Sequence, residues 1–254
     1  MTPAVPFCLG SPSTLKFHAE PGKRPESGWW WGGWMGLVLG LFVVIGGCDA
    51  SDSPPGTNHS VEEQADLVVA ALAASDWPAV ARHVHPDRGL LFSPYAYVEP
   101  TQRRFHAADG TVLDVMARAD ENRFVLPRPT DPGTLVFDRA RIAAFAADTT
   151  TYMWGRYDGK GTPIELTVEE YWEEFLYRHD FAQAQRGAPN EELGSGNSIN
   201  NLPEVMGENA VFVEYYVPGT DEYSGMDWGS LRVVFEETDD ARYLIGLVRD
   251  QWTI

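Results

Sequence analysis

Few residues of this sequence stand in a pattern that points to chemistry. His179 and Asp180 are adjacent after a predicted helix, and a histidine beside a carboxylate is a pairing used in general-base catalysis. Adjacent side chains on a helix do not face each other, so the simpler interpretation is a favourable cation at a helix C-terminus. We therefore assign no catalytic residue from the sequence.

His83, His85 and Asp87 form the pattern H-x-H-x-D. In a strand this spacing would place both histidines on one face, as a pair of metal ligands requires. The pattern falls at the expected end of a helix, where such side chains diverge, so hydrogen bonds to helix-terminal carbonyls are the simpler interpretation. We expect no metal ligands and no cofactor. Calcium stays open, because the acidic pairs at 221–222 and 239–240 could supply oxygen ligands.

Residues 193–201 are rich in Gly, Ser and Asn but lack the lysine and the spacing of a phosphate-binding P-loop. A tight connection between two elements is the better interpretation of this segment. The sequence also contains neither G-x-S-x-G nor H-E-x-x-H, the patterns of a hydrolase nucleophile and of a zinc protease.

Aromatic side chains are the other candidates, because ligand pockets have mostly apolar walls with a few polar groups. Ordinary core packing would explain the same residues. If the fold leaves a pocket open, we expect six aromatic and two polar side chains to line it: Tyr95, Tyr97, Trp154, Tyr157, Trp228, Trp252, His179 and Asp227.

Two helices are expected to open the domain that positions these residues. Residues 61–74 carry apolar residues at helical spacing, and Ser60 followed by Glu63 matches a capping box. A short second helix should run to about residue 84, with Asp76 as its N-cap and Pro78 in its first turn.

The rest of the chain alternates turn residues with β-prone runs, and Asp109-Gly110 is a hairpin signal. Pro94 restricts the first run to an edge or a bulge. We expect strands at 90–98, 105–115, 152–157, 164–166, 211–217, 230–235 and 243–248, a loop at 122–134, a short helix at 137–147, and a helix capped by Thr167 and Glu170.

Helices first and antiparallel strands last indicate an α+β fold. The opening helix, the short helix ending in "HVHPDRG" and the closing hairpin "SLRVVFEETDDARYLIGLVRDQWTI" resemble the start and end of an NTF2-like domain. That resemblance implies N-terminal helices packed on a curved antiparallel sheet, with a cone-shaped pocket between them. We expect a single domain over residues 61–254 with an elaborated middle region, within 99–150 or 167–205.

The stretches "FSPYAYV", "WGRYDGKGTPIELTVEEYWEEF", "GSGNSINN" and "GMDWGSLRVVFE…DQWTI" are also similar to an uncharacterised family of bacterial lipoproteins. This second resemblance covers most of residues 62–254. It implies an exported protein but no particular activity.

Basic residues and then the uncharged run 35–47 precede Cys48, which is the layout of a secretory signal. The run is shorter than the roughly 20 apolar residues that span a bilayer. Ile45-Gly46-Gly47-Cys48 resembles the bacterial lipobox, which implies cleavage before Cys48 and a lipid on its thiol. The alternative is an uncleaved transmembrane helix that includes the tryptophan cluster at 29–34. The polar residues 48–60 are expected to be a flexible tether.

The composition excludes several classes of partner and site. The chain has 37 acidic and 19 basic residues and a formal net charge of −18, so it should repel the phosphate backbone of a nucleic acid. The two cysteines, Cys8 and Cys48, both precede the expected domain. That domain therefore has no thiol for a nucleophile, a zinc site or a disulfide.

Three functions fit these expectations. The first is a lipid-anchored protein of the cell envelope whose extracytoplasmic domain is a noncatalytic module that binds a small molecule or a protein. The second is an NTF2-like enzyme of the isomerase or cyclase type, with His179 or Asp227 in an open pocket. The third is a structural envelope protein that binds a partner through its sheet, which a cone filled by Trp and Phe would favour.

Overall fold

The computed structural model describes residues 59–100, 102–105, 112–115, 134–194, 196 and 198–253. The signal sequence, Cys48 and most of the tether lie outside these residues, so the predicted anchor stays a prediction. No helix within the described ranges is long and apolar enough to cross a membrane.

Two helices open the described part as the sequence predicts. Helix α1 spans Val61–Ala73, and Ser60 and Glu63 form the expected capping box. Helix α2 spans Trp77–His83, with the Asp76 carboxylate accepting a hydrogen bond from the backbone of Ala79 at 3.0 Å. Because Ser60 satisfies a backbone group of α1, it belongs structurally to the helix rather than to the tether.

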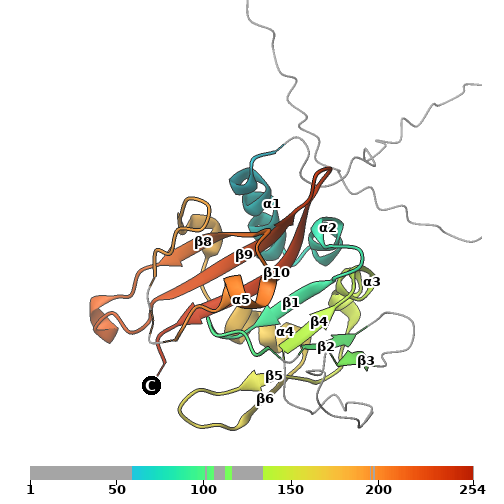
Figure 1. The fold of residues 1–254 in the computed structure, drawn as a ribbon. Coiled ribbons are helices and arrows are strands. Elements are labelled where there is room, and N and C mark those ends of the chain that lie inside the picture. The colour runs from blue at the N-terminus through green and yellow to red at the C-terminus, as the bar shows by residue number, and fades with distance from the viewer. Residues whose placement is uncertain are drawn as a thin grey trace, which may run out of the picture. The chain divides into compact units, whose positions relative to one another are not determined.

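The main sheet contains eight strands in the described residues, in the order β3-β2-β4-β1-β10-β9-β8-β7 (Figure 1). The strands are β1 (Leu90–Ser93), β2 (Gln102–Phe105), β3 (Val112–Val115), β4 (Thr134–Phe137), β7 (Gln185–Arg186), β8 (Ala210–Val217), β9 (Gly229–Glu237) and β10 (Arg242–Gln251).

The sheet is mixed, which corrects the expectation of a wholly antiparallel one. Strand β1 pairs with β10 in parallel, and β2 pairs with β4 in parallel, whereas the other neighbours are antiparallel. Parallel neighbours need a long crossover, and most of the domain lies between β1 and β10. The α+β class is confirmed, with a mostly antiparallel sheet.

A second sheet has two antiparallel strands, β5 (Tyr152–Arg156) and β6 (Pro163–Leu166), joined by a turn that contains Asp158-Gly159. Thr167 caps the following helix together with Glu170, as predicted. The remaining helices are α3 (Arg139–Ala143), η1 (Phe145–Ala147), α4 (Val168–Tyr171), η2 (Trp172–Leu176), η3 (Phe181–Gln183), α5 (Leu202–Met206) and η4 (Asp221–Tyr223).

Two segments differ from the sequence-based expectation. Strand β1 ends at Ser93, and Pro94 starts a series of bends where a strand to residue 98 was expected. The expected helix at 137–147 begins later, because residues 134–137 form the buried strand β4. All four side chains of β4 are buried, so it shows no alternation that could identify it as a strand.

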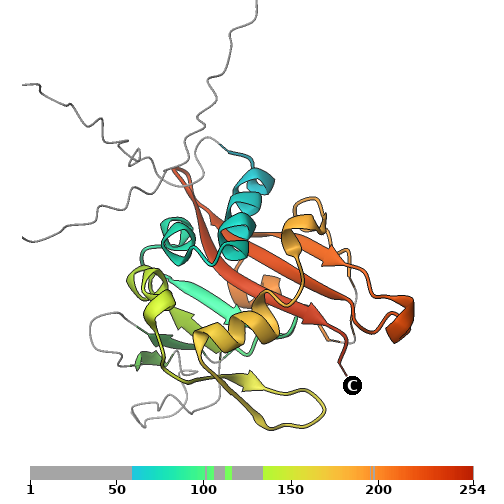
Figure 2. The same ribbon diagram turned by 180° about the vertical axis from the view of Figure 1, so that it is seen from behind.

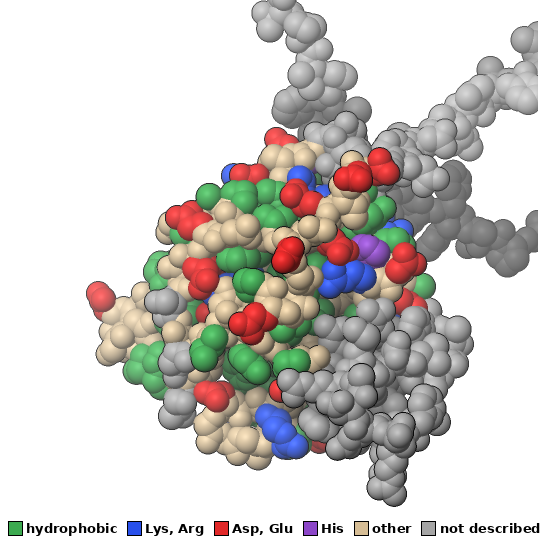
Figure 3. Space-filling view, in the orientation of Figure 1, with side chains coloured by type: hydrophobic (Ala, Val, Ile, Leu, Met, Phe, Trp, Pro, Cys, Tyr) green, Lys and Arg blue, Asp and Glu red, His purple; other side chains and the backbone are tan. Residues whose placement is uncertain are grey.

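Each face of the sheet is covered by other parts of the chain. Helices α1, α2 and α4 lie across one face (Figure 2), where side chains such as Val68, Phe92 and Phe235 form the larger apolar core. Helix α5 lies on the opposite face (Figure 1) and packs Leu202 and Met206 into a smaller core. The face seen in Figure 3 carries acidic side chains dispersed across it, as expected for a solvated acidic surface.

Candidate functional site

A pocket of about 620 Å³ opens where the main sheet meets the end of the α4–η2 helical segment. We call it the Trp228 pocket. Four of the eight predicted residues line it, namely His179, Asp227, Trp228 and Trp252. The other lining residues are Arg178, Val217, Pro218, Thr220, Tyr223, Met226 and Gln251.

The register of the sheet explains why residues distant in sequence meet in this pocket. Gly229 at the start of β9 pairs with Gln251 at the end of β10 and with Val217 at the end of β8. The flanking residues Trp228 and Trp252 therefore lie at the same end of the sheet. The β8–β9 connection closes one side of the pocket.

A π-helical turn positions the wall of the pocket that Arg178 and His179 form. The backbone N–H of Tyr177 donates to the carbonyl of Trp172 at 2.7 Å, a five-residue step that widens the last turn of the helix. The chain leaves the helix at Tyr177, and Arg178 and His179 then extend to the pocket. Turns of this kind are frequent at functional sites.

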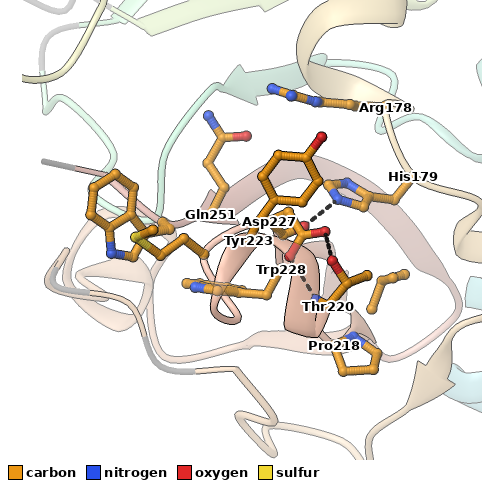
Figure 4. A pocket seen from close by; sticks show the side chains of 11 residues that line it. Arg178, His179, Pro218, Thr220, Tyr223, Asp227, Trp228 and Gln251 are labelled. Carbon is orange, nitrogen blue, oxygen red and sulfur yellow. Dashed lines mark hydrogen bonds between the residues drawn. The ribbon is translucent and has the colours of Figure 1, made fainter.

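Asp227 shapes the β8–β9 connection rather than forming a dyad with His179 (Figure 4). Its two carboxylate oxygens accept hydrogen bonds from the backbone and the hydroxyl of Thr220, at 2.6 and 2.8 Å. The hydrogen bond from the Thr220 backbone lowers the pKa of Asp227, so the carboxylate stays charged at neutral pH. It is an acceptor that is already occupied.

His179 has both ring nitrogens engaged. Its Nε2 lies 3.0 Å from the backbone carbonyl of Asp227, which can only accept, so this nitrogen carries the proton. Its Nδ1 lies 3.4 Å from the guanidinium of Arg249 and accepts from it. Burial lowers the pKa of His179, with Arg249 and Arg178 acting in the same direction. The imidazole is therefore neutral and has no free lone pair for a general base.

Arg249 is a fully buried cation that lies behind His179. Its guanidinium donates to the carbonyls of Phe175, at 2.6 Å, and of Ser230, and lies 4.7 Å from the centre of the Phe181 ring. Burial lowers the pKa of Arg249 to about 9, so it is still protonated at neutral pH. It fixes the tautomer of His179.

The other predicted aromatic residues lie elsewhere. Tyr95, Tyr97 and Trp154 line a separate pocket of about 250 Å³, beside Met153 and Arg156. Tyr157 lines neither pocket: its hydroxyl donates to Glu174 at 2.8 Å, and burial and this bond raise its pKa to about 12. The expectation of one pocket lined by all eight residues is therefore wrong.

The space between the helices and the sheet is filled rather than hollow. The Trp154 and Tyr171 rings stack at 3.9 Å, and Phe92, Phe137 and Phe175 pack edge-on or stacked around them. All five side chains are at most 2% exposed. The interior between these helices and the sheet therefore offers no room for a ligand in the described part, and the Trp228 pocket lies outside this aromatic core.

The glycine-rich segment is a close-packed connection, as predicted, and it carries no secondary structure in the residues described. A Cβ on Gly194 would lie 2.8 Å from the Tyr216 ring, and one on Gly196 would lie 3.2 Å from the Trp228 ring. The glycines thus allow the backbone to lie against Trp228, on whose indole the pocket is built.

His83 and His85 have different partners. His83 lies 3.4 Å from Gln64, whereas His85 pairs through Nε2 with Glu236 at 3.3 Å and accepts backbone hydrogen bonds at Nδ1. Burial lowers the pKa of His83 to about 4. Among the described residues no group of three or more potential ligand side chains is placed to hold a metal ion.

Sequence reasoning missed Arg178, Gln251, Tyr223 and Met226 as lining residues. Two of them are direct neighbours of predicted residues, since Arg178 precedes His179 and Gln251 precedes Trp252. Residues adjacent in sequence at the end of a helix or strand can line the same pocket, so Arg178 and Gln251 could have been predicted from their neighbours. Tyr223 and Met226 offered no signal beyond their place in a turn-rich segment.

Comparison with known proteins returned no match: no protein-family model fits the chain, and no curated protein and no solved structure matches it.

Proposed function

We propose that this chain is a lipid-anchored protein of the bacterial cell envelope, whose extracytoplasmic domain binds a small molecule in the Trp228 pocket without transforming it. Lipid on Cys48 would hold the protein at the membrane. The proposal also places the chain in the family of exported bacterial lipoproteins that its sequence resembles, and gives its domain an NTF2-like fold.

The arrangement of the elements supports the NTF2-like part of the proposal. The two opening helices pack on one face of the sheet, and the closing hairpin of β9 and β10 lies in the middle of it. Strands β2 and β3, the small sheet and the segment before β8 are the elaboration of the minimal fold.

The gathering of exposed aromatic and apolar side chains around one pocket is the observation that carries the binding proposal. Of the six large apolar side chains that are exposed in the described residues, three line it: Tyr223 at 55%, Met226 at 47% and Trp252 at 44%. Trp228 forms a further, largely buried wall. A cluster of exposed apolar side chains around a pocket is typical of a ligand-binding site.

Two competing functions have less support. An enzyme of the isomerase or cyclase type would need a free base, but His179 uses both nitrogens and Asp227 both oxygens within the protein. A partner bound across the open sheet would need an uncovered face. In the described part, however, both apolar faces of the sheet are covered: the N-terminal helices pack on one face, and α5 packs on the other.

A retention experiment tests the proposal. The full chain in lipid nanodiscs is incubated with a pool of bacterial small molecules, and the compounds that stay bound are identified by mass spectrometry. We expect Trp252→Ala to lose the compound that the natural protein retains, because this side chain is an exposed wall of the pocket. The retained compound should be recovered with unchanged mass.

The matched control is Tyr97→Ala, which removes an aromatic side chain of similar exposure, 49%, from the other pocket. This variant should retain the compound. Equal retention by the Trp252→Ala protein would show that the Trp228 pocket is not the site, and a compound returned with altered mass would favour the enzyme.

A further inference from the structure

Arg178 lines the Trp228 pocket and forms no hydrogen bond or ion pair with any residue that the structure describes. Some other arginines of the domain have carboxylate partners, such as Arg186 with Asp66 and Arg232 with Asp250. The chain has 37 acidic residues against 19 basic ones, so carboxylates are plentiful. An arginine that faces a pocket without one therefore has its hydrogen-bonding capacity available to a ligand.

Two other polar groups of the pocket are already hydrogen-bonded within the protein. The carboxylate of Asp227 accepts from Thr220 at both oxygens, and His179 is engaged at both nitrogens. Arg178 extends across one side of the pocket toward the side-chain amide of Gln251 (Figure 4). A guanidinium presents its N–H groups in a planar fork that matches the two oxygens of a carboxylate.

The opposite part of the wall is flat and apolar. The indole of Trp228 is held in one orientation, since Gly194 and Gly196 pack against it and the Tyr216 ring lies 6.0 Å away. Trp252 and Tyr223 add exposed rings that line the same space. Aromatic walls of this kind stack on planar rings of a ligand.

We propose that the Trp228 pocket selects a small monoanionic ligand: a carboxylate that binds Arg178, with Gln251 beside it, attached to a planar apolar body that packs on Trp228 and Trp252. This inference rests on the proposed binding function and specifies the ligand class of the same site. Arg178 is the one arginine or lysine among the described residues that line the pocket, so it matches a single negative charge, and the net negative charge of the chain disfavours ligands of higher charge.

The test uses two probes that share a ring system and differ in charge, 1-naphthylacetate and 1-naphthylacetamide. Each is titrated by calorimetry into the full chain in phosphatidylcholine nanodiscs, with empty discs as the blank. We expect the anion to bind the natural protein more tightly than the amide. Arg178→Met should weaken binding of the anion about two- to fivefold and leave binding of the amide unchanged, since one solvent-exposed charged contact is lost.

Arg82→Met is the matched control, because it removes the same charge from an exposed position in the last turn of α2. It should alter the affinity for neither probe. Equal affinities of the natural protein for both probes, or an anion affinity that Arg178→Met leaves intact, would overturn the inference. If Trp252→Ala weakens binding of both probes in that case, the proposed function survives. If neither probe binds, or Trp252→Ala changes neither affinity, the pocket and the inference fall together.

Discussion

At the scale of single residues, Arg249 shows how the domain tolerates a buried cation without a carboxylate. Two backbone carbonyls, an aromatic ring and the Nδ1 lone pair of His179 satisfy the guanidinium. The consequence for His179 is decisive, because the lone pair that a general base would use is directed into the protein. The pocket thus contains a histidine and a carboxylate that hold its walls in place.

Four of the eight residues that the sequence suggests for one pocket lie around the Trp228 pocket, whereas the other four lie elsewhere. The reason is geometric. Trp154 lies in strand β5 of the small sheet and Tyr95 in the bends after β1, and their position relative to β9 and β10 depends on long-range packing that no local pattern reports. The engaged state of His179 depends on Arg249, which lies 70 residues away in sequence.

Asp250 provides a prediction about pH and stability. It is 2% exposed and lies 3.2 Å from Arg232, with the buried Glu214 also beside that arginine. Burial raises the pKa of Asp250 to about 6, against the effect of Arg232. The folded state therefore takes up a proton at a pH where the unfolded chain, whose carboxyl has its ordinary value near 3.8, has not. The contribution of Asp250 to stability increases as the pH falls from above 6 toward 4.

Asp250→Asn mimics the protonated side chain at every pH. Relative to the natural protein, the variant should be more stable by about 1–3 kcal/mol at pH 7.5, and this difference should disappear near pH 4.5. Urea unfolding at the two pH values measures the difference. An advantage that is the same at both pH values would show that the carboxyl stays charged in the folded state at both, and would contradict the prediction.

At the scale of elements, local sequence signals predicted the helix caps and the long strands, which depend mainly on neighbouring residues. Both capping boxes, the Asp76 cap and the three long strands β8, β9 and β10 appear within a few residues of their expected bounds. Strand β4 was missed because its four buried residues lack alternation, and the parallel pairing of β1 with β10 was missed because it joins distant parts of the chain. Pairing between distant strands is decided by the packed core.

The start of β9 offers a test of how this strand supports the pocket. Gly229 carries no side chain at the point where β9 passes beneath His179, and a Cβ there would lie 2.7 Å from the imidazole Cε1 and 2.9 Å from the guanidinium of Arg249. Both groups are held by hydrogen bonds, so neither can move without losing one. Gly229→Ala should therefore destabilise the fold by about 1–3 kcal/mol.

The same substitution should shift the NMR signals of His179 and weaken ligand retention by the Trp228 pocket. Thermal unfolding and a histidine-detected spectrum check the two effects together. Unchanged stability with an unperturbed His179 signal would contradict the prediction. It would mean that the backbone of β9 shifts to accommodate the added methyl group without disturbing His179.

At the scale of the whole molecule, charge and coverage limit where a partner can bind. The chain has a formal charge of −18, which should disfavour binding to anionic lipid and nucleic acid, and helices of the described part cover the apolar faces of its sheet. In the proposed lipoprotein, the segment before the domain is therefore the part that should attach it to the membrane. The carbonyl of His59 accepts a hydrogen bond from Arg242, and Ser60 caps α1, so these two residues are held against the domain that was expected to start at Val61.

The anchor itself lies outside the described residues and is tested directly by chemistry. Residues 35–47 carry no charge and end in Ile45-Gly46-Gly47 immediately before Cys48. That run is too short to cross a bilayer comfortably, whereas each buried acyl CH₂ contributes about 0.8 kcal/mol, so two acyl chains would anchor the protein stably. We expect mass spectrometry of the native protein to find a mature N-terminus at Cys48 carrying two or three acyl chains.

Cys48→Ser removes the nucleophile that receives the lipid, and should therefore block both acylation and cleavage. Its precursor could still adhere to membranes through residues 29–47, so fractionation alone does not decide between the two forms of attachment. The mass of the mature chain distinguishes the two forms, because acylation increases the mass and cleavage before Cys48 decreases it. A native protein that keeps residues 29–47 and has a free thiol at Cys48 would contradict the lipoprotein and establish a transmembrane segment instead, with the same domain and the same Trp228 pocket outside the membrane.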